Sequence, residues 1–484
     1  MNSALPRTAE APPGRAAAQA DSISERLAAF TAALTLAEVP AEVLLRAKHL
    51  ILDGIGCAFA AGGEPFAREI AGSIARLAGR GERRVIGMNL RLPMRDAALA
   101  NGMLLHGLDY DDTHAAGIVH LTASLFPAAL ARAAESGASG AELLLACLAG
   151  IEAGARLASV VKGGFHQVGF HPTSLVGTFA CSLAAGRIRG LSPARLAAAQ
   201  GIALSFAAGS LQFVEDGSWT KRVHPGWSAV CGLTAAELAA GEFPAPREAY
   251  EGRFGLYRIH LPPAAFERCE LDVATRDLGR VWETMNVAVK PFPACHFVHA
   301  CSDAAIALHR EGVDPDRVRS ILALVPAGVV EAVCEPVQAK RRPKSDYDAK
   351  FSIPYAVASG LARGRVGLAE LRPEALVEPR IERIMDKVEY AVDPAAEFPR
   401  YYGGEVRVVM DDGRSFTHRV AVNRGHPERP LANAEIEAKY LENASLALDP
   451  AAAARLRDLV LGLELLPAAE RLEAELGATE GALR

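Results

Sequence analysis

The sequence has few of the features that mark several large classes of protein. Only 6% of its 484 residues are aromatic, and its eight cysteines are scattered without a CxxC pair. This distribution excludes a disulfide framework and a structural zinc site, and it disfavours an iron–sulfur cluster. The motifs GxGxxG, GxxxxGK[ST] and GxSxG are also missing. We therefore expect neither a phosphate-binding glycine loop nor a serine-hydrolase elbow.

The net charge and the hydropathy pattern argue against further classes of protein. The formal net charge of −5 lacks the positive excess typical of a nucleic-acid or anionic-membrane surface. Residues 163–186 and 196–214 carry no Asp, Glu, Lys or Arg, but His171 and Gln212 interrupt them, so we expect buried helices rather than membrane spans. Residues 1–21 have no apolar signal-peptide core and are expected to form a flexible tail. A cytoplasmic location follows from these absences.

Residues 22–280 have the pattern of a large all-helical domain. Half of the chain is hydrophobic, and Ala and Leu recur there at spacings of three and four residues. Glycine pairs and Ser-Pro steps separate the helical segments. Many Ala and Gly residues on the apolar faces allow close helix–helix contact. No heptad is sustained, so we expect a compact bundle instead of a coiled coil.

The pattern changes after about residue 281. β-Branched runs predict strands, and Asp411-Asp412-Gly413 lies between two of them as a hairpin turn. Helical patterns at 300–310 and 355–362 separate these strands. Residues 281–428 are therefore predicted to form a smaller α+β domain, and 429–484 return to helix. The predicted strands are residues 320–325, 329–333, 387–392, 405–409 and 415–422.

The most informative segment for function is a dense polar island between two helical runs. Helix capping accounts for one Asp or Thr but not for six ionisable groups within 15 residues, so a functional role is indicated. A metal site is disfavoured because no HxxxH pair with a carboxylate ligand is present. The six groups are His106, Asp109, Asp111, Asp112, His114 and His120.

Three further islands complete the set of candidate side chains. His171 precedes a proline at a helix start, where the helix dipole is positive, although a lone histidine is often structural. Basic residues before the next long helix can bind carboxylates, or can simply be solvated. Together the islands supply acids, imidazoles, cations and a phenol, which suits proton transfer on a small anionic substrate. The remaining candidates are Lys221, Arg222, His224, Cys295, Lys350 and Tyr355.

The ordered set of motifs resembles the MmgE/PrpD family, which includes 2-methylcitrate dehydratase, cis-aconitate decarboxylase and iminodisuccinate epimerase. The matching segments occur in the family's order and span about residues 22–428. They are Leu52-Asp-Gly-Ile-Gly-Cys-Ala58, Asn101-Gly-Met, Asp109-Tyr-Asp-Asp-Thr113, Gly169-Phe-His171-Pro-Thr-Ser174, Thr220-Lys221, Lys290-Pro-Phe-Pro293 and Lys350-Phe-Ser-Ile-Pro-Tyr355.

The resemblance implies an all-helical domain interrupted by an α+β lid, a homodimer, and an active site between the two domains without metal or other cofactor. By resemblance, catalysis falls to Asp109, His120, His171, Lys221 and Tyr355. Substrate binding falls to Thr113, Arg222, His224, Cys295 and Lys350. Cys295 stands where the decarboxylases have a histidine, which makes decarboxylation a less favoured reaction. Leu121 replaces a common proline after His120, so the match at His120 is weaker than at His171.

Three related reactions on a small di- or tricarboxylate fit this set of residues. A non-catalytic protein is kept as an alternative to all three. Dehydration is the first choice, epimerisation or isomerisation the second, and decarboxylation the third. In each, His171 or His120 would move a proton, Asp109 would orient an imidazole, and Lys221 would hold carboxylate oxygens. Tyr355 would protonate the leaving hydroxyl or close the lid. The alternative class, a non-catalytic helical scaffold, would be marked by loss of these residues.

Overall fold

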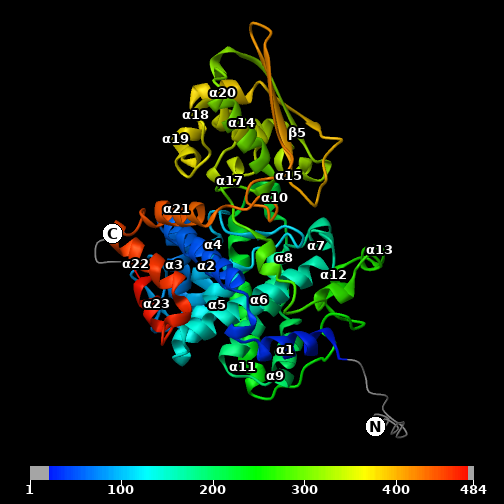
Figure 1. The fold of residues 1–484 in the computed structure, drawn as a ribbon, viewed down its shortest axis with the longest axis vertical. Coiled ribbons are helices and arrows are strands. Elements are labelled where there is room, and N and C mark those ends of the chain that lie inside the picture. The colour runs from blue at the N-terminus through cyan, green and yellow to red at the C-terminus, as the bar shows by residue number, and fades with distance from the viewer. Residues whose placement is uncertain (1–20, 478–484) are drawn as a thin grey trace, which may run out of the picture.

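The computed structural model describes residues 21–477 as a larger helical part and a smaller part built around a sheet (Figure 1). The mainly α fold predicted from the sequence is confirmed. The expected tail, residues 1–21, lies outside the described residues apart from Asp21. Every helix within 21–477 is too short or too polar to cross a membrane.

The helical part follows the predicted run of helices up to about residue 240. Serine caps begin two of them: Ser22 and Glu25 form a reciprocal capping box on α1, and the Ser139 hydroxyl caps α6. The main helices are α1 Ile23–Ala33, α2 Ala41–Gly62, α3 Pro65–Leu77, α4 Met94–His106, α5 Thr122–Ser136, α6 Gly140–Ser159, α8 Pro172–Ile188, α9 Pro193–Ala203 and α11 Val223–Ala240.

Glycines let α11 approach two other helices closely. A Cβ on Gly102 of α4 would lie 2.7 Å from the Cα of Gly226 in α11, and one on Gly232 would lie 2.3 Å from the Cβ of Cys181 in α8. A side chain at either glycine would force these helices apart, because real Cβ atoms do not approach so closely. Hence α4, α8 and α11 are fixed relative to one another, and so are the ends that they present to the sheet-containing part.

The sheet has the order β6-β5-β7-β8. The β5–β6 pair is parallel, whereas β5–β7 and β7–β8 are antiparallel, and the predicted hairpin at 411–413 joins β7 to β8. Helices α14 (His299–Arg310) and α18 (Ile353–Arg363), both predicted, share one core with the sheet. The strands are β5 Val318–Val325, β6 Val388–Val392, β7 Gly404–Met410 and β8 Ser415–Val420.

The predicted strand at 329–333 is wrong. The chain forms a 3-10 turn, η7 (Ala327–Val329), followed by the short helix α15 (Val330–Val333). Val329 and Val333 are four residues apart, and both are buried in the core that the sheet shares with α14 and α18. That spacing suits a single helical turn, and a short apolar run does not distinguish this arrangement from a strand.

A short strand pair lies in the helical part, close to the point where the chain enters the sheet-containing part. Strand β3 (Thr113–His114) pairs antiparallel with β4 (Val287–Ala288), so that Thr113 faces Ala288. Trp282 and Val289 pack in the helical cores. We therefore propose that the helical domain continues to about residue 290, and we call 291–428 the lid. The C-terminal helices α21 (Asn433–Ala444), α22 (Pro450–Leu461) and α23 (Glu470–Glu475) return to the helical domain, where α21 lies along α2.

Candidate active site

A cavity of about 90 Å³ lies between the helical domain and the lid. Residues from both parts line it, so neither part forms it alone. The structure brings six of the ten predicted site residues to its wall: Asp109, Thr113, His120, His171, Lys221 and Cys295.

The polar side chains of the helical domain gather in or beside the cavity because they lie at helix ends. His106 is the last residue of α4, and His171 is the N-cap of α8. Lys221 lies in the turn η2 (Trp219–Arg222), which runs directly into α11. Since glycine contacts hold these helices together, their ends meet on the face beneath the lid. His120 joins them from the short segment before α5.

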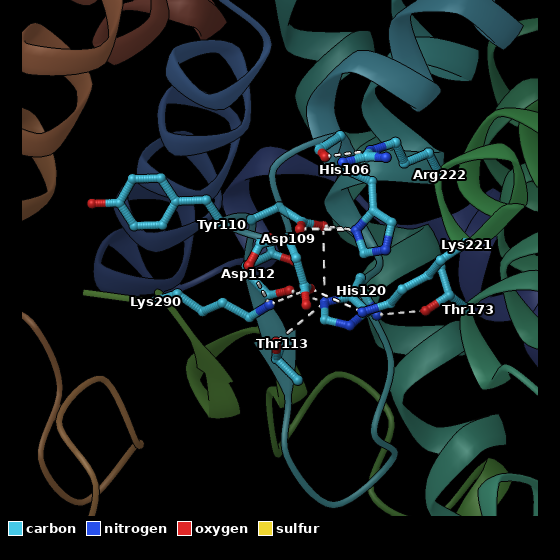
Figure 2. Close-up of polar contacts among 12 residues, drawn as sticks. His106, Asp109, Tyr110, Asp112, Thr113, His120, Thr173, Lys221, Arg222 and Lys290 are labelled. Atoms are coloured by element: carbon cyan, nitrogen blue, oxygen red, sulfur yellow. Dashed lines mark hydrogen bonds and ion pairs between the residues drawn. The ribbon is translucent and has the colours of Figure 1, made fainter. Parts of the chain in front are cut away.

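Asp109 is the centre of a buried ion cluster (Figure 2). Its Oδ1 lies 3.0 Å from the Nζ of Lys221 and 2.7 Å from the Nζ of Lys290. Lys290 also donates to the main-chain carbonyl of Asp109 at 2.8 Å. Asp109 has a φ of 53°, a left-handed conformation that is uncommon for residues other than glycine. This conformation is maintained at the point where two cations converge, as is common at functional sites.

Burial alone would raise the pKa of Asp109, but the charges of Lys221 and Lys290 outweigh it and hold the pKa well below its usual range. Asp109 is therefore ionised at neutral pH. Its second oxygen, Oδ2, has no hydrogen-bond partner among the described residues. The carboxylate thus offsets one of the two ammonium charges.

The neighbouring carboxyls behave differently. Asp111 accepts from the Nδ1 of His106 with both oxygens at 2.9 Å. Against the effect of burial, His106 and His120 lower the pKa of Asp111 to about 2. Burial, with the charge of Asp111 added, raises the pKa of Asp112 to about 7. The imidazole-orienting contact expected of Asp109 is therefore made by Asp111.

His120 has a fixed tautomer. Its Nδ1 lies 2.7 Å from the main-chain carbonyl of Asp112, and because a carbonyl only accepts, this nitrogen carries the hydrogen. Burial lowers the pKa of His120 well below its usual value, and the charge of Lys290 adds to this against the opposing effect of Asp111. The neutral ring therefore leaves its Nε2 with a free lone pair beside the cavity. A main-chain bond from His120 to the hydroxyl of Thr173, at 3.1 Å, holds its backbone.

His171 and His224 form a pair of imidazoles. Their Nδ1 atoms lie 2.8 Å apart, so one donates and the other accepts. Burial lowers the pKa of both, to about 4 for His224, and holds that of His171 well below its usual value. His171 lines the cavity, whereas His224 lies behind it. Sequence analysis assigned His224 to the substrate, but its contact is with His171.

The structure does not bring Tyr355, Arg222 or Lys350 to the cavity wall. The hydroxyl of Tyr355 donates to the main-chain carbonyl of Glu370, deep in the lid. Arg222 donates from Nε to the carbonyl of Gly107 at 2.7 Å, and its guanidinium lies against the rings of Phe66, Trp219 and Tyr347. Lys350 is buried 3.4 Å from Asp346. These three predicted residues therefore make structural contacts away from the cavity wall.

Lys290 is the main residue absent from the predicted set. It is 1% exposed and contributes the shorter of the two bonds to Asp109. Its signal was present in the sequence, because the Lys290-Pro-Phe-Pro293 segment is one of the family motifs. The cavity also has an apolar wall that motif analysis did not predict. This wall consists of Ile118, Leu211, Phe213, Val214, Phe297 and Phe351.

Three imidazoles near the cavity could in principle hold a metal ion. Ring nitrogens of His106, His120 and His171 lie within 4.8 Å of one another. Against this, the ammonium groups of Lys221 and Lys290 lie next to the same cluster and would repel a divalent cation. The donor set suits proton transfer better than metal binding.

Family models and curated relatives match this chain over most of its length. The sequence model of the MmgE/PrpD N-terminal domain matches residues 25–269, and that of the MmgE/PrpD C-terminal domain matches 292–465. A cis-aconitate decarboxylase-like protein of Aspergillus oryzae is 28% identical over 91% of this chain and 94% of its own length. The cis-aconitate decarboxylase of Aspergillus terreus is 28% identical over 89% and 90%, and the human enzyme 29% identical over 88% and 89%.

Proposed function

This chain belongs to the MmgE/PrpD family, and on that premise we propose that it is a cofactor-independent lyase acting on a small di- or tricarboxylate. The reaction we favour is dehydration of the 2-methylcitrate dehydratase type. One observation carries the proposal: an imidazole kept neutral, that of His120, has its free lone pair beside two buried lysines. A neutral base next to fixed cations suits removal of a proton α to a carboxylate.

The proposed reaction balances with the groups present. His120 takes the α-proton through Nε2, and the electron pair left on carbon forms the double bond. The hydroxyl on the adjacent carbon leaves as water with the proton that His120 has taken, which the His120 imidazolium delivers directly or through His171, so that both rings return to the neutral state. Lys221 and Lys290 stabilise the enolate-like charge on the substrate carboxylate, in a site where burial strengthens the interaction.

Two alternatives share this machinery. Epimerisation needs proton removal and return on opposite faces of one carbon, and the rings of His120 and His171, with centroids 5.9 Å apart, offer two groups for that. Decarboxylation is favoured by the relatives, several of which are cis-aconitate decarboxylases. The carbon that loses CO₂ needs a proton that does not come from the substrate, and neutral resting imidazoles carry none to give, so we place decarboxylation behind dehydration, which recycles the substrate's own proton.

Incubation with di- and tricarboxylates in D₂O, followed by NMR, separates the three reactions. Dehydration gives a new olefinic signal, epimerisation gives deuterium at the stereocentre with no new carbon skeleton, and decarboxylation gives a product one carbon shorter. We expect the first result, and Lys221→Met should slow it by about 10²–10³. Loss of CO₂ as the dominant outcome would replace dehydration by the decarboxylase alternative. No change in any substrate would reject the lyase proposal.

The sequence also leads to expectations for the oligomeric state and the cellular location of the protein. We propose a homodimer located in the cytoplasm, on the family resemblance and the sequence pattern respectively. Light scattering coupled to size-exclusion chromatography tests the first, with a mass twice the chain mass expected. Fractionation of cells that express the full chain tests the second.

A further inference from the structure

We infer that the substrate carries at most two carboxylates, with an apolar substituent where a tricarboxylate would have its third. This inference rests on the proposed function: it keeps dehydration as the reaction and narrows the substrate to a dicarboxylate, which excludes 2-methylcitrate itself because that acid carries three carboxylates. It follows from three properties of the cavity: its charge, its hydrogen-bond donors and its apolar wall.

The cavity supplies little positive charge. Two ammonium groups line it, and the carboxylate of Asp109 offsets one of them. Burial lowers the pKa of all four lining histidines, to about 4 for His166 and about 3 for His296, and it holds the pKa of His120 and His171 well below the usual value. No arginine belongs to the lining among residues 21–477. A single net positive charge is a poor match for three carboxylates.

The donors are equally limited. A lysine ammonium has three N–H groups. Lys221 uses one on Asp109, and Lys290 uses two, on Oδ1 and on the main-chain carbonyl of the same residue. The hydroxyl of Tyr402 donates to the carbonyl of Ala115 at 3.0 Å. The free N–H groups of the two lysines satisfy one carboxylate, and only neutral donors are left for any other: Thr113 and the imidazoles of His166, His171 and His296.

The rest of the cavity is apolar. The helical domain contributes Ile118, Leu211, Phe213 and Val214, and the lid contributes Phe297 and Phe351. A third carboxylate held against these side chains would lose its water without gaining a donor, which costs several kcal/mol. A methyl or branched alkyl group in the same place would be stabilised by burial. The wall therefore selects against charge on that arm of the substrate.

Three hydroxy acids that differ only in this arm test the inference. Citrate carries CH₂–COO⁻ there, 2-hydroxy-2-methylbutanedioate carries a methyl group, and 2-hydroxy-2-(2-methylpropyl)butanedioate carries an isobutyl group with the shape of CH₂–COO⁻ but no charge. We expect kcat/KM for the better of the two dicarboxylates to exceed that for citrate about 100-fold, as expected for an unpaired buried charge. Equal or better turnover of citrate would overturn the inference.

A substitution in the wall should reverse the preference. Val214 lines the cavity and is 38% exposed, so Val214→Arg adds a cation that the fold can accommodate. We expect it to raise the citrate-to-isobutyl ratio of kcat/KM at least 10-fold. Val392→Arg, on an exposed valine of β6 that is 49% exposed and lies outside the cavity lining, should leave this ratio unchanged. An unchanged ratio in Val214→Arg would count against the wall as the selecting feature.

Failure of the inference is distinguishable from failure of the proposed function. If none of the three acids reacts or exchanges deuterium, the lyase proposal fails for them. Isothermal titration of the same acids then decides the inference by affinity: tighter binding of a dicarboxylate supports it, and tighter binding of citrate overturns it.

Discussion

The Nζ of Lys290 lies 2.7 Å from the Oδ1 of Asp109 and donates to the main-chain carbonyl of the same residue, although 181 positions separate the two in sequence. Asp109 belongs to the loop after α4, whereas Lys290 lies where the chain enters the lid. Lys221 reaches the same oxygen from the start of α11. The proposed carboxylate-binding site is thus assembled from three distant segments around one buried anion.

Removing either lysine should reduce catalysis, but with different effects on stability. Lys221→Met deletes one stabiliser of the developing negative charge, so we expect kcat/KM to fall by about 10²–10³. Asp109 keeps Lys290 as its partner, so the melting temperature should change little. Steady-state kinetics and thermal denaturation check both outcomes, and normal turnover would remove Lys221 from the mechanism.

Lys290→Met is the matched comparison. In the wild type, Lys290 is 1% exposed, and its ammonium makes two bonds to Asp109. One of these bonds goes to the main-chain carbonyl of Asp109, whose backbone has the left-handed conformation. We expect the same loss of turnover together with a destabilisation of about 3 kcal/mol, the scale of breaking a buried pair. A melting temperature as high as that of Lys221→Met would show that the second bond contributes little.

The pH dependence should reflect the neutral state of His120. Its pKa is depressed by burial, so the base remains unprotonated below pH 6.5, its usual value. We expect kcat/KM, which reports the free enzyme, to stay level as pH falls through 6.5 and to decline only at lower pH. His120→Gln should lower turnover by about 10²–10⁴. A decline in kcat/KM that begins at or above pH 6.5 as the pH is lowered would point to a different base.

Chelation should leave activity intact. The lysines beside His106, His120 and His171 oppose binding of a divalent cation, and the proposed steps are all proton transfers. Turnover after dialysis against EDTA is therefore expected to equal that before it. Loss of activity that zinc or another divalent ion restores would assign the three imidazoles to a metal.

Tyr355→Phe tests a residue that sequence analysis placed among the catalytic groups. The hydroxyl bonds to the carbonyl of Glu370 and does not line the cavity. We expect turnover to remain within about threefold of the wild type, with the free energy of unfolding lowered by about 1 kcal/mol for a lost buried hydrogen bond. A loss of turnover of about two orders of magnitude at unchanged stability, the scale of removing a general acid, would return Tyr355 to the mechanism.

The fold was largely predictable from local patterns. The helices of the large domain follow from apolar spacing and caps, and the β7–β8 hairpin from Asp411-Asp412-Gly413. The failure at 329–333 has a local cause as well, because two valines four residues apart in a short segment that contains Glu331 fit either secondary structure.

The site was predictable only in part. Motifs identified which residue types matter, and Asp109, His171 and Lys221 do meet at one cavity. They did not give side-chain direction: Lys221 and Arg222 are adjacent, yet one points to Asp109 and the other to the carbonyl of Gly107. Direction is set by long-range packing, which a single sequence does not display. The same holds for the apolar wall, whose members come from both domains.

The β3–β4 pairing constrains how this protein can be rebuilt. Thr113 and Ala288 are neighbours across two strands, and Lys290 follows two residues later. A chimaera that exchanges the lid with that of a relative must therefore join the chains after Lys290. A junction before β4 would bring in the relative's own β4 and lysine, which evolved to fit the relative's loop. The ion pair between this lysine and Asp109 would then be mismatched even if both halves folded. Such an exchange would replace Phe297 and Phe351 of the apolar wall, while the other wall residues and the proton-transfer groups stay with the helical domain.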